Sequence, residues 1–88
     1  MIEKTVTIEN KLGLHARPSA LFVETASRFA SNITAIKDGL EVNGKSIMGV
    51  LMLAAEFGSQ LTLRIDGEDE NEMLAALIDL IKSKYNED

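Results

Sequence analysis

The chain has 88 residues, a net charge of −5 and no cysteine. We therefore expect one domain over residues 1–88, with neither a disulfide nor a thiolate metal site. A single histidine excludes a zinc site built from several histidines, and we expect no metal and no cofactor. The acidic balance and the scarcity of aromatic residues argue against binding of nucleic acid, because phosphate contacts dominate that affinity. No apolar run is long enough for membrane insertion and no signal-peptide pattern opens the chain, so we expect a soluble cytoplasmic protein.

The first half of the chain predicts a strand, a helix and a hairpin. Apolar and polar residues alternate over residues 2–8, as in a strand with one buried face. Apolar residues recur at steps of three and four from residue 16 to about residue 29, which predicts an amphipathic helix. Two short strands follow at 32–37 and 40–42. Between them, Asp38-Gly39 is typical of a two-residue hairpin turn, since both positions tolerate positive φ.

The second half predicts a short helix, a strand and a longer helix. Ser46 is a favourable cap for a helix over about 47–54, and alternation predicts a strand over 61–65. Asp69 with Glu72 three residues on predicts a capping box for a last helix that runs to about residue 84.

The predicted order of elements is βαββαβα. Four short strands suit a single mixed or antiparallel sheet with helices covering one face. The sequence therefore predicts an α+β open-faced sandwich, a four-stranded sheet with three helices on one face.

The segment Gly-Leu-His-Ala-Arg-Pro at 13–18 places the only histidine at the predicted start of the first helix. Pro18 suits the first turn of a helix, where its missing N–H costs nothing, so His15 lies near the N-cap beside the amides of Ala16 and Arg17. A helix N-terminus attracts an oxyanion and disfavours an imidazolium. A neutral imidazole is a nucleophile, and the Arg17 guanidinium suits a phosphoryl group. On spacing alone, a surface histidine beside a helix cap remains the commoner interpretation.

This segment closely resembles the active-site signature of the HPr family, the histidine-containing phosphocarriers of the bacterial phosphoenolpyruvate-dependent phosphotransferase system (PTS). Lys-Ser-Ile-Met-Gly-Val at 45–50 resembles the regulatory-serine segment of the same family, and the likeness covers essentially the whole chain. It implies that His15 accepts a phosphoryl group from enzyme I on Nδ1 and passes it to enzyme IIA proteins, usually for sugar uptake. The Ala16 amide and Arg17 would stabilise the phosphate, with no stand-alone catalytic activity.

Two further roles follow from the resemblance. Ser46 would be phosphorylated by an HPr kinase/phosphorylase, in addition to capping its helix. That helix is apolar on almost every side, and one helix on a sheet cannot bury all of these side chains. Val50 and Leu53 can point inward. By resemblance to the family, Ile47, Met48 and Leu51 would form a docking patch next to His15, together with Ala20 of the first helix.

Several alternatives stay open. Ser19 stands where alanine is more usual in the family, and its hydroxyl is a candidate for a further phosphate contact. The chain also has features of proteobacterial forms that serve a nitrogen-related or purely regulatory branch, so the downstream acceptor is not fixed. An acyl carrier is disfavoured by the four strands and by the lack of an Asp-Ser-Leu motif, and an RNA-binding domain by the lack of stacking aromatics. We expect a monomer.

Overall fold

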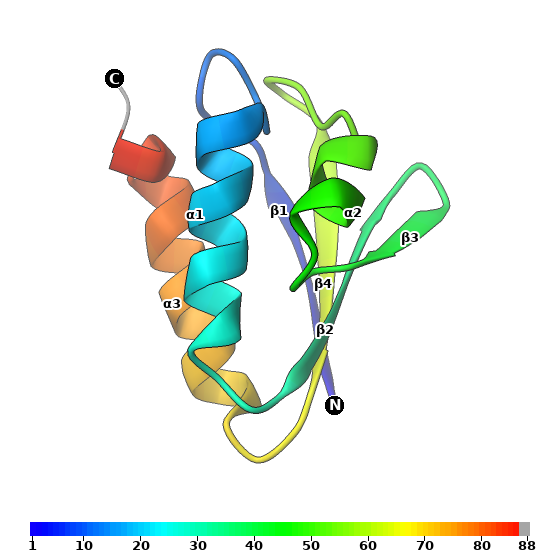
Figure 1. The fold of residues 1–88 in the computed structure, drawn as a ribbon, viewed down its shortest axis with the longest axis vertical. Helices are drawn as coiled ribbons and strands as arrows, with labels where there is room; N and C mark the ends of the chain where they lie inside the picture. The colour runs from blue at the N-terminus through cyan, green and yellow to red at the C-terminus, as the bar shows by residue number, and fades with distance from the viewer. Residues whose placement is uncertain (87–88) are drawn as a thin grey trace.

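The computed structural model describes residues 1–86, which form a four-stranded antiparallel sheet covered by three helices (Figure 1). The strands are β1 (Ile2–Thr7), β2 (Asn32–Lys37), β3 (Leu40–Asn43) and β4 (Gln60–Asp66), in the spatial order β1-β4-β2-β3. The helices are α1 (Ala16–Ser27), α2 (Ile47–Met52) and α3 (Glu70–Lys82), followed by a 3₁₀ turn η1 (Lys84–Asn86). The predicted fold class and element order are confirmed.

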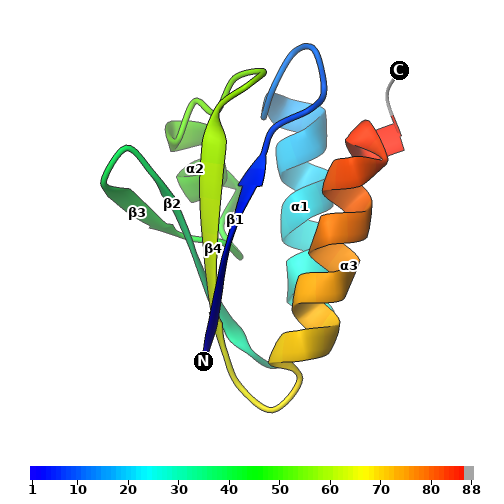
Figure 2. The same cartoon turned by 180° about the vertical axis from the view of Figure 1, so that it is seen from behind.

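The two faces of the sheet differ in chemistry because side chains alternate along each strand. Leu63 of β4 is paired with Lys4 of β1 on one side and with Ala35 of β2 on the other, and this row lies on the face that the helices cover. The next row lies on the uncovered face, where Thr5 and Thr62 are hydrogen-bonded at 2.9 Å. Figure 2 shows this side, with β1 toward α3 and β3 at the far edge.

The core lies between the sheet and the helices. Helix α1 packs against both α2 and α3 and lies between them in Figure 1. The core is built from apolar residues of the sheet and of the helices. Its fully buried members are Ile8, Phe22, Ala26, Val50, Leu61, Leu63, Ile65, Met73, Leu77 and Tyr85.

The element boundaries follow local signals closely. The turn between β2 and β3 has positive φ at Asp38 and Gly39, 51° and 82°, as the hairpin signal requires. Helix α1 ends at Ser27, two residues before the predicted end, and α3 ends at Lys82 instead of about residue 84. Helix α2 ends at Met52, because the chain turns sharply where φ becomes positive.

The predicted capping box at the start of α3 is wrong. Asp69 has the N-cap position, but its carboxylate makes no cap hydrogen bond. It accepts hydrogen bonds from the amides of Ala30 and Ser31, at 2.8 and 2.9 Å, and from the Ser31 hydroxyl. Glu70 instead accepts from the amide of Gly67. Asp69 thus connects α3 to the loop between α1 and β2, a contact across 38 residues that no local pattern encodes.

The contact of Asp69 with this loop predicts a stability that depends on pH. The Ser31 hydroxyl and the amides of Ala30 and Ser31 hold the pKa of the Asp69 carboxyl below its ordinary value. The contribution of the Asp69 carboxylate to the stability of the fold is therefore present above the ordinary aspartate pKa of about 3.9. It is lost as the pH falls through the pKa of Asp69 in the folded state. In urea unfolding, we expect Asp69→Ala to have a lower free energy of unfolding than the wild type at neutral pH. The difference in free energy between the two proteins should become smaller in acid. A gap of constant size from neutral to strongly acid pH would contradict this assignment.

Candidate functional site

His15 lies at the start of α1, as predicted. It has the N-cap position, with extended backbone angles, and its side chain makes no cap hydrogen bond. Its carbonyl accepts the first helical hydrogen bond, from the amide of Ser19 at 3.0 Å. The amides of Ala16 and Arg17 precede that bond, in the turn where a helix offers no intrahelical acceptor. An anion attached to the half-exposed His15 ring would therefore meet the positive end of the helix dipole.

The loop before His15 is held by the loop after α2. Gly13 has φ of +66°, and the amide of Leu14 donates to the carbonyl of Ala55 at 2.7 Å. The side-chain amide of the buried Asn10 donates to the carbonyl of Gly13 at 2.7 Å. These bonds fix the backbone that carries His15 to a distant part of the chain, so the position of the histidine depends on the folded core.

Ser19 does not contribute to a phosphate site. Its side chain is fully buried, and its hydroxyl donates to the carbonyl of Leu14 at 3.1 Å. The expectation of a phosphate contact fails because the residue faces the core side of α1. Pro18 is buried beside it in the first turn, in agreement with the sequence analysis.

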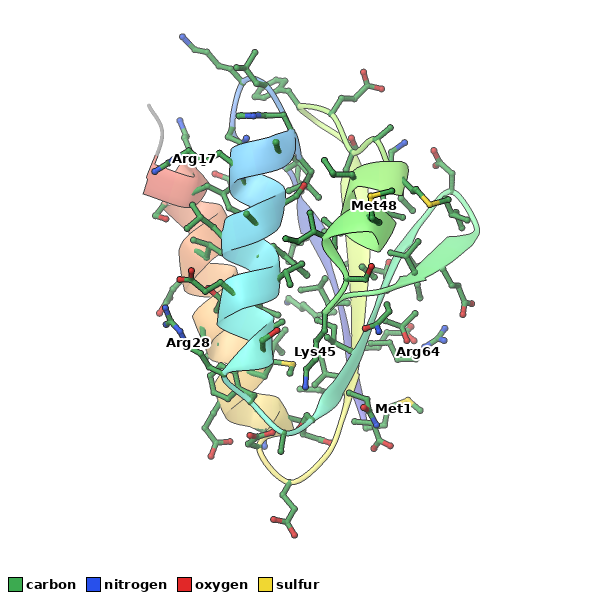
Figure 3. All side chains as sticks on the ribbon, in the orientation of Figure 1. Met1, Arg17, Arg28, Lys45, Met48 and Arg64 are labelled. Carbon is green, nitrogen blue, oxygen red and sulfur yellow. The ribbon has the colours of Figure 1, made fainter. Side chains whose placement is uncertain are left out.

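Arg17 lies one residue inside the helix, and its guanidinium points toward the C-terminal turn. Its Nη1 donates to the carbonyl of Tyr85 at 3.1 Å. Figure 3 shows Arg17 on the side of α1 that faces this turn, away from α2. The side chain is exposed, so a rotamer change can bring it to an anion on His15. The sequence could not reveal this acceptor, because Tyr85 lies 68 residues away.

Ser46 caps α2 as predicted. Its hydroxyl accepts a hydrogen bond from the amide of Gly49 at 3.1 Å. Just before it, the ammonium group of Lys45 donates to the carbonyl of Phe29 at 2.8 Å and so ties the start of α2 to the end of α1. The Ser46 side chain is half-buried.

The division of α2 into two faces agrees with the sequence analysis. Val50 and the adjoining Leu53 are buried in the core. Met48 is 71% exposed and lies on the outer side of α2 in Figure 3. We call the predicted set Ala20, Ile47, Met48 and Leu51 the α1–α2 patch. The first three are exposed and Leu51 is partly exposed, on two helices that pack against each other.

Three further exposed apolar side chains were not predicted from the sequence. Met52, on α2, is 65% exposed, and it could have been found from its spacing of four residues after Met48. Leu12 and Phe57 are 75% and 63% exposed, on the two loops joined by the bond from Leu14 to Ala55. These two residues lie in loops, where no helical periodicity predicts which side chains are exposed.

Residues 1–86 contain no helix long and apolar enough to span a membrane. In the same part of the chain, no three or more histidine, cysteine, aspartate or glutamate side chains gather where they could bind a metal ion.

Comparisons with known proteins identify the family of the chain. The family described as "PTS HPr component phosphorylation site" matches residues 2–83. The phosphocarrier protein HPr of Xylella fastidiosa (strain Temecula1) is 52% identical over 88 residues, covering 100% of this chain and 99% of that protein. The crystal structure of HPr from Thermoanaerobacter tengcongensis superimposes with a TM-score of 0.96 at 52% identity, covering 100% and 99% of the two chains.

A third relative is described as a dimer. The crystal structure of Crh from Bacillus subtilis, described as a swapped dimer, has a TM-score of 0.75 at 45% identity and covers 96% of this chain and 97% of its own. The full-length match to the family, at about half identical residues, is far above the level that a shared fold alone produces. The chain therefore belongs to the HPr family of phosphocarriers of the phosphotransferase system.

Proposed function

We propose that His15 is the phosphoryl acceptor, that enzyme I is its donor and that enzyme IIA proteins receive the group. The observation that carries this proposal is the placement of the half-exposed His15 at the N-terminus of α1, beside the amides of Ala16 and Arg17. Membership of the HPr family supplies the class of reaction. We place the reaction in the cytoplasm, where the partners of this family work.

The transfer needs little from the protein beyond position and charge. The lone pair on His15 Nδ1 attacks the phosphorus carried by a histidine of the donor, and the donor P–N bond breaks as the new P–N bond forms. The neutral ring that attacks carries its proton on Nε2; this proton leaves as the new P–N bond forms and the donor imidazole takes one up, so atoms and charge balance. The Ala16 amide is fixed at the helix start before the reaction, and the Arg17 guanidinium reaches the developing negative charge by a rotamer change from the Tyr85 carbonyl; both stabilise the transition state. In a second transfer of the same kind, phosphorylated His15 is the donor and a histidine of an enzyme IIA protein accepts the phosphoryl group.

The proposal is tested with labelled phosphoenolpyruvate and enzyme I. We expect one phosphoryl group per chain, labile in acid and stable in alkali, as a phosphoramidate on histidine is. A wild-type chain that takes up no label, or a label that resists acid, would refute the assignment. A chain that discharges its label only to a regulatory enzyme IIA, and not to a sugar-specific one, would assign it to the nitrogen-related branch.

We further propose that the α1–α2 patch is the docking surface for enzyme I. Met48→Asp places a charge where an apolar partner would bury a methionine, and we expect transfer from enzyme I to slow by about tenfold or more. The free energy of unfolding should change by less than about 0.5 kcal/mol, because Met48 is 71% exposed. Rapid-quench kinetics measure the transfer. Leu40→Asp, an exposed apolar position on β3, is the matched control, and equal slowing of both variants would remove Met48 from the surface.

Ser46 is proposed as a regulatory phosphorylation site for an HPr kinase/phosphorylase. A dianion at the start of α2 is compatible with the helix dipole, and it would repel acidic groups of a partner docking on the α1–α2 patch. We expect ATP-dependent labelling by such a kinase in the wild type and none in Ser46→Ala. The same variant should lose about 1 kcal/mol of stability, because the bond to the Gly49 amide disappears. Labelling that survives in Ser46→Ala would disprove the regulatory role.

The oligomeric state expected from the sequence, a monomer, stays a prediction. The swapped dimer of Crh shows that a relative can assemble differently. Light scattering across a concentration series, at neutral pH, distinguishes the two states.

A further inference from the structure

A groove lies on the opposite side of the molecule from the α1–α2 patch, between β1 and α3. It has a volume of about 350 Å³ and is open to solvent along one side. Its floor is apolar, from Ile78 and Ile81 of α3 and Val6 of β1. This volume lies at the lower end of the range for ligand sites, about 300–1,000 Å³. None of its lining residues is used in the proposed phosphoryl transfer.

One wall of the groove is the backbone edge of β1. Four consecutive residues of the strand, 4–7, line it. Because neighbouring side chains of a strand point to opposite faces, a wall made of consecutive residues exposes the main chain itself. The strand pairs with β4 on one side only and is the outer strand of the sheet. Its other edge therefore presents backbone N–H and C=O groups that can pair with an added strand.

The charges around this edge favour an acidic occupant. Lys4 and Lys82 line the groove, with Glu9 as the one acidic residue. Among the described residues, neither of these lysines takes part in an ion pair, whereas Arg28, Lys37 and Arg64 all do. Two ammonium groups thus stay available beside an apolar floor in a chain whose net charge is −5.

We propose that this groove binds an extended acidic segment of a partner protein, which adds to β1 as a fifth strand. Main-chain hydrogen bonds to β1 would hold the segment, its apolar side chains would cover Ile78 and Ile81, and its carboxylates would face Lys4 and Lys82. A second copy of this chain fits less well. Two copies paired through β1 would bring four lysines of the two grooves together, and that repulsion disfavours the pairing.

The groove leaves the α1–α2 patch uncovered. Helix α1 packs against both α2 and α3 and separates them, and β1 is at the edge of the sheet farthest from β3 (Figures 1 and 2). A partner held at β1 can thus stay bound while His15 exchanges its phosphoryl group at the other surface.

The experiment is a titration of the ¹⁵N-labelled full chain with a short blocked peptide of the repeat glutamate-threonine-valine-threonine, here called the glutamate–valine peptide. In a strand its glutamates and valines lie on one face, which matches Lys4 and the groove floor on the helix-covered side of β1. We expect amide shift changes confined to β1, α3 and β4, with the α1–α2 patch unchanged. The absence of shifts at about 5 mM peptide would overturn the proposal, since a millimolar dissociation constant would already fill most sites. Shifts centred on α2 would also overturn it, as would changes that depend on protein concentration without peptide, which indicate self-association.

Matched variants test the charge and the backbone separately. Lys4→Glu and Lys82→Glu should each weaken binding by about threefold or more, whereas Lys11→Glu, an exposed lysine outside the groove, should leave it unchanged. The double variant K4E/K82E should instead bind a peptide in which lysine replaces each glutamate of the glutamate–valine peptide. A glutamate–valine peptide with methylated backbone nitrogens should lose binding. Equal binding of the methylated peptide would exclude strand addition, and equal weakening by Lys11→Glu would exclude a specific role for Lys4 and Lys82.

Discussion

Replacing His15 by alanine is expected to reduce labelling from phosphoenolpyruvate and enzyme I by at least about a thousandfold, since the variant has no nucleophile. The fold should persist. The His15 side chain makes no cap hydrogen bond, and its carbonyl, which accepts from Ser19, is kept in the variant. Alanine is nevertheless a poor N-cap residue, so a loss of stability of up to about 1 kcal/mol is the most we expect. Urea unfolding of the variant checks that labelling is lost because the imidazole is absent and not because the protein is unfolded.

Arg17→Ala separates the acceptor from the group that stabilises the phosphate. This variant should still be labelled, but about 10–100 times more slowly. The expected loss is smaller than the roughly 100–1,000-fold cost of removing a preorganised donor, because the guanidinium must first leave the Tyr85 carbonyl. Its bond to the carbonyl of Tyr85 is also lost, so its stability is measured in parallel. His15→Ala labelled as fast as the wild type would refute the central proposal, and Arg17→Ala with unchanged kinetics would remove Arg17 from the site.

Gly13→Ala is expected to have the largest effect on stability, with a loss of about 3 kcal/mol. Two costs combine. The residue has φ of +66°, which a side chain disfavours, and a Cβ there would meet the carbonyl oxygen of Ala55 and come within 2.7 Å of the Glu56 Cα. These are backbone atoms, held in place by the bond from Leu14 to Ala55, so they cannot move aside cheaply. For a domain of this size, the melting temperature should fall by roughly 10–20 °C.

Gly39→Ala is the matched control for this variant. Gly39 has φ of +82°, but nothing lies within 4 Å of an added Cβ. It should therefore show only the conformational cost, about 1–2 kcal/mol. Calorimetry or urea unfolding gives both values, and equal losses at Gly13 and Gly39 would show that the contact with Ala55 is unimportant. Transfer to His15 should also be slower in Gly13→Ala, because the loop that positions the histidine is displaced.

The features that the sequence predicted well are those encoded over a few neighbouring residues. The hairpin turn depends on Asp38 and Gly39 alone, the cap of α2 on Ser46 and the amide three residues later, and the placement of His15 on the proline that follows it. Each of these involves atoms within one turn of the chain, so the pattern contains nearly all the physical information. The role of His15 came from the resemblance to a family, because helix chemistry alone is equally consistent with an inert surface histidine.

The sequence by itself thus determined the order of the elements, the apolar faces of α1 and α3, and the position of the histidine at a helix N-terminus. Only the tertiary structure decided which atoms meet across the chain. It directed the Asp69 carboxylate to Ala30 and Ser31 instead of its own helix, and it gave Arg17 the carbonyl of Tyr85. Such contacts form when packing of the core brings distant segments together, and no local pattern specifies the partner. The same packing left β1 as an open edge beside α3.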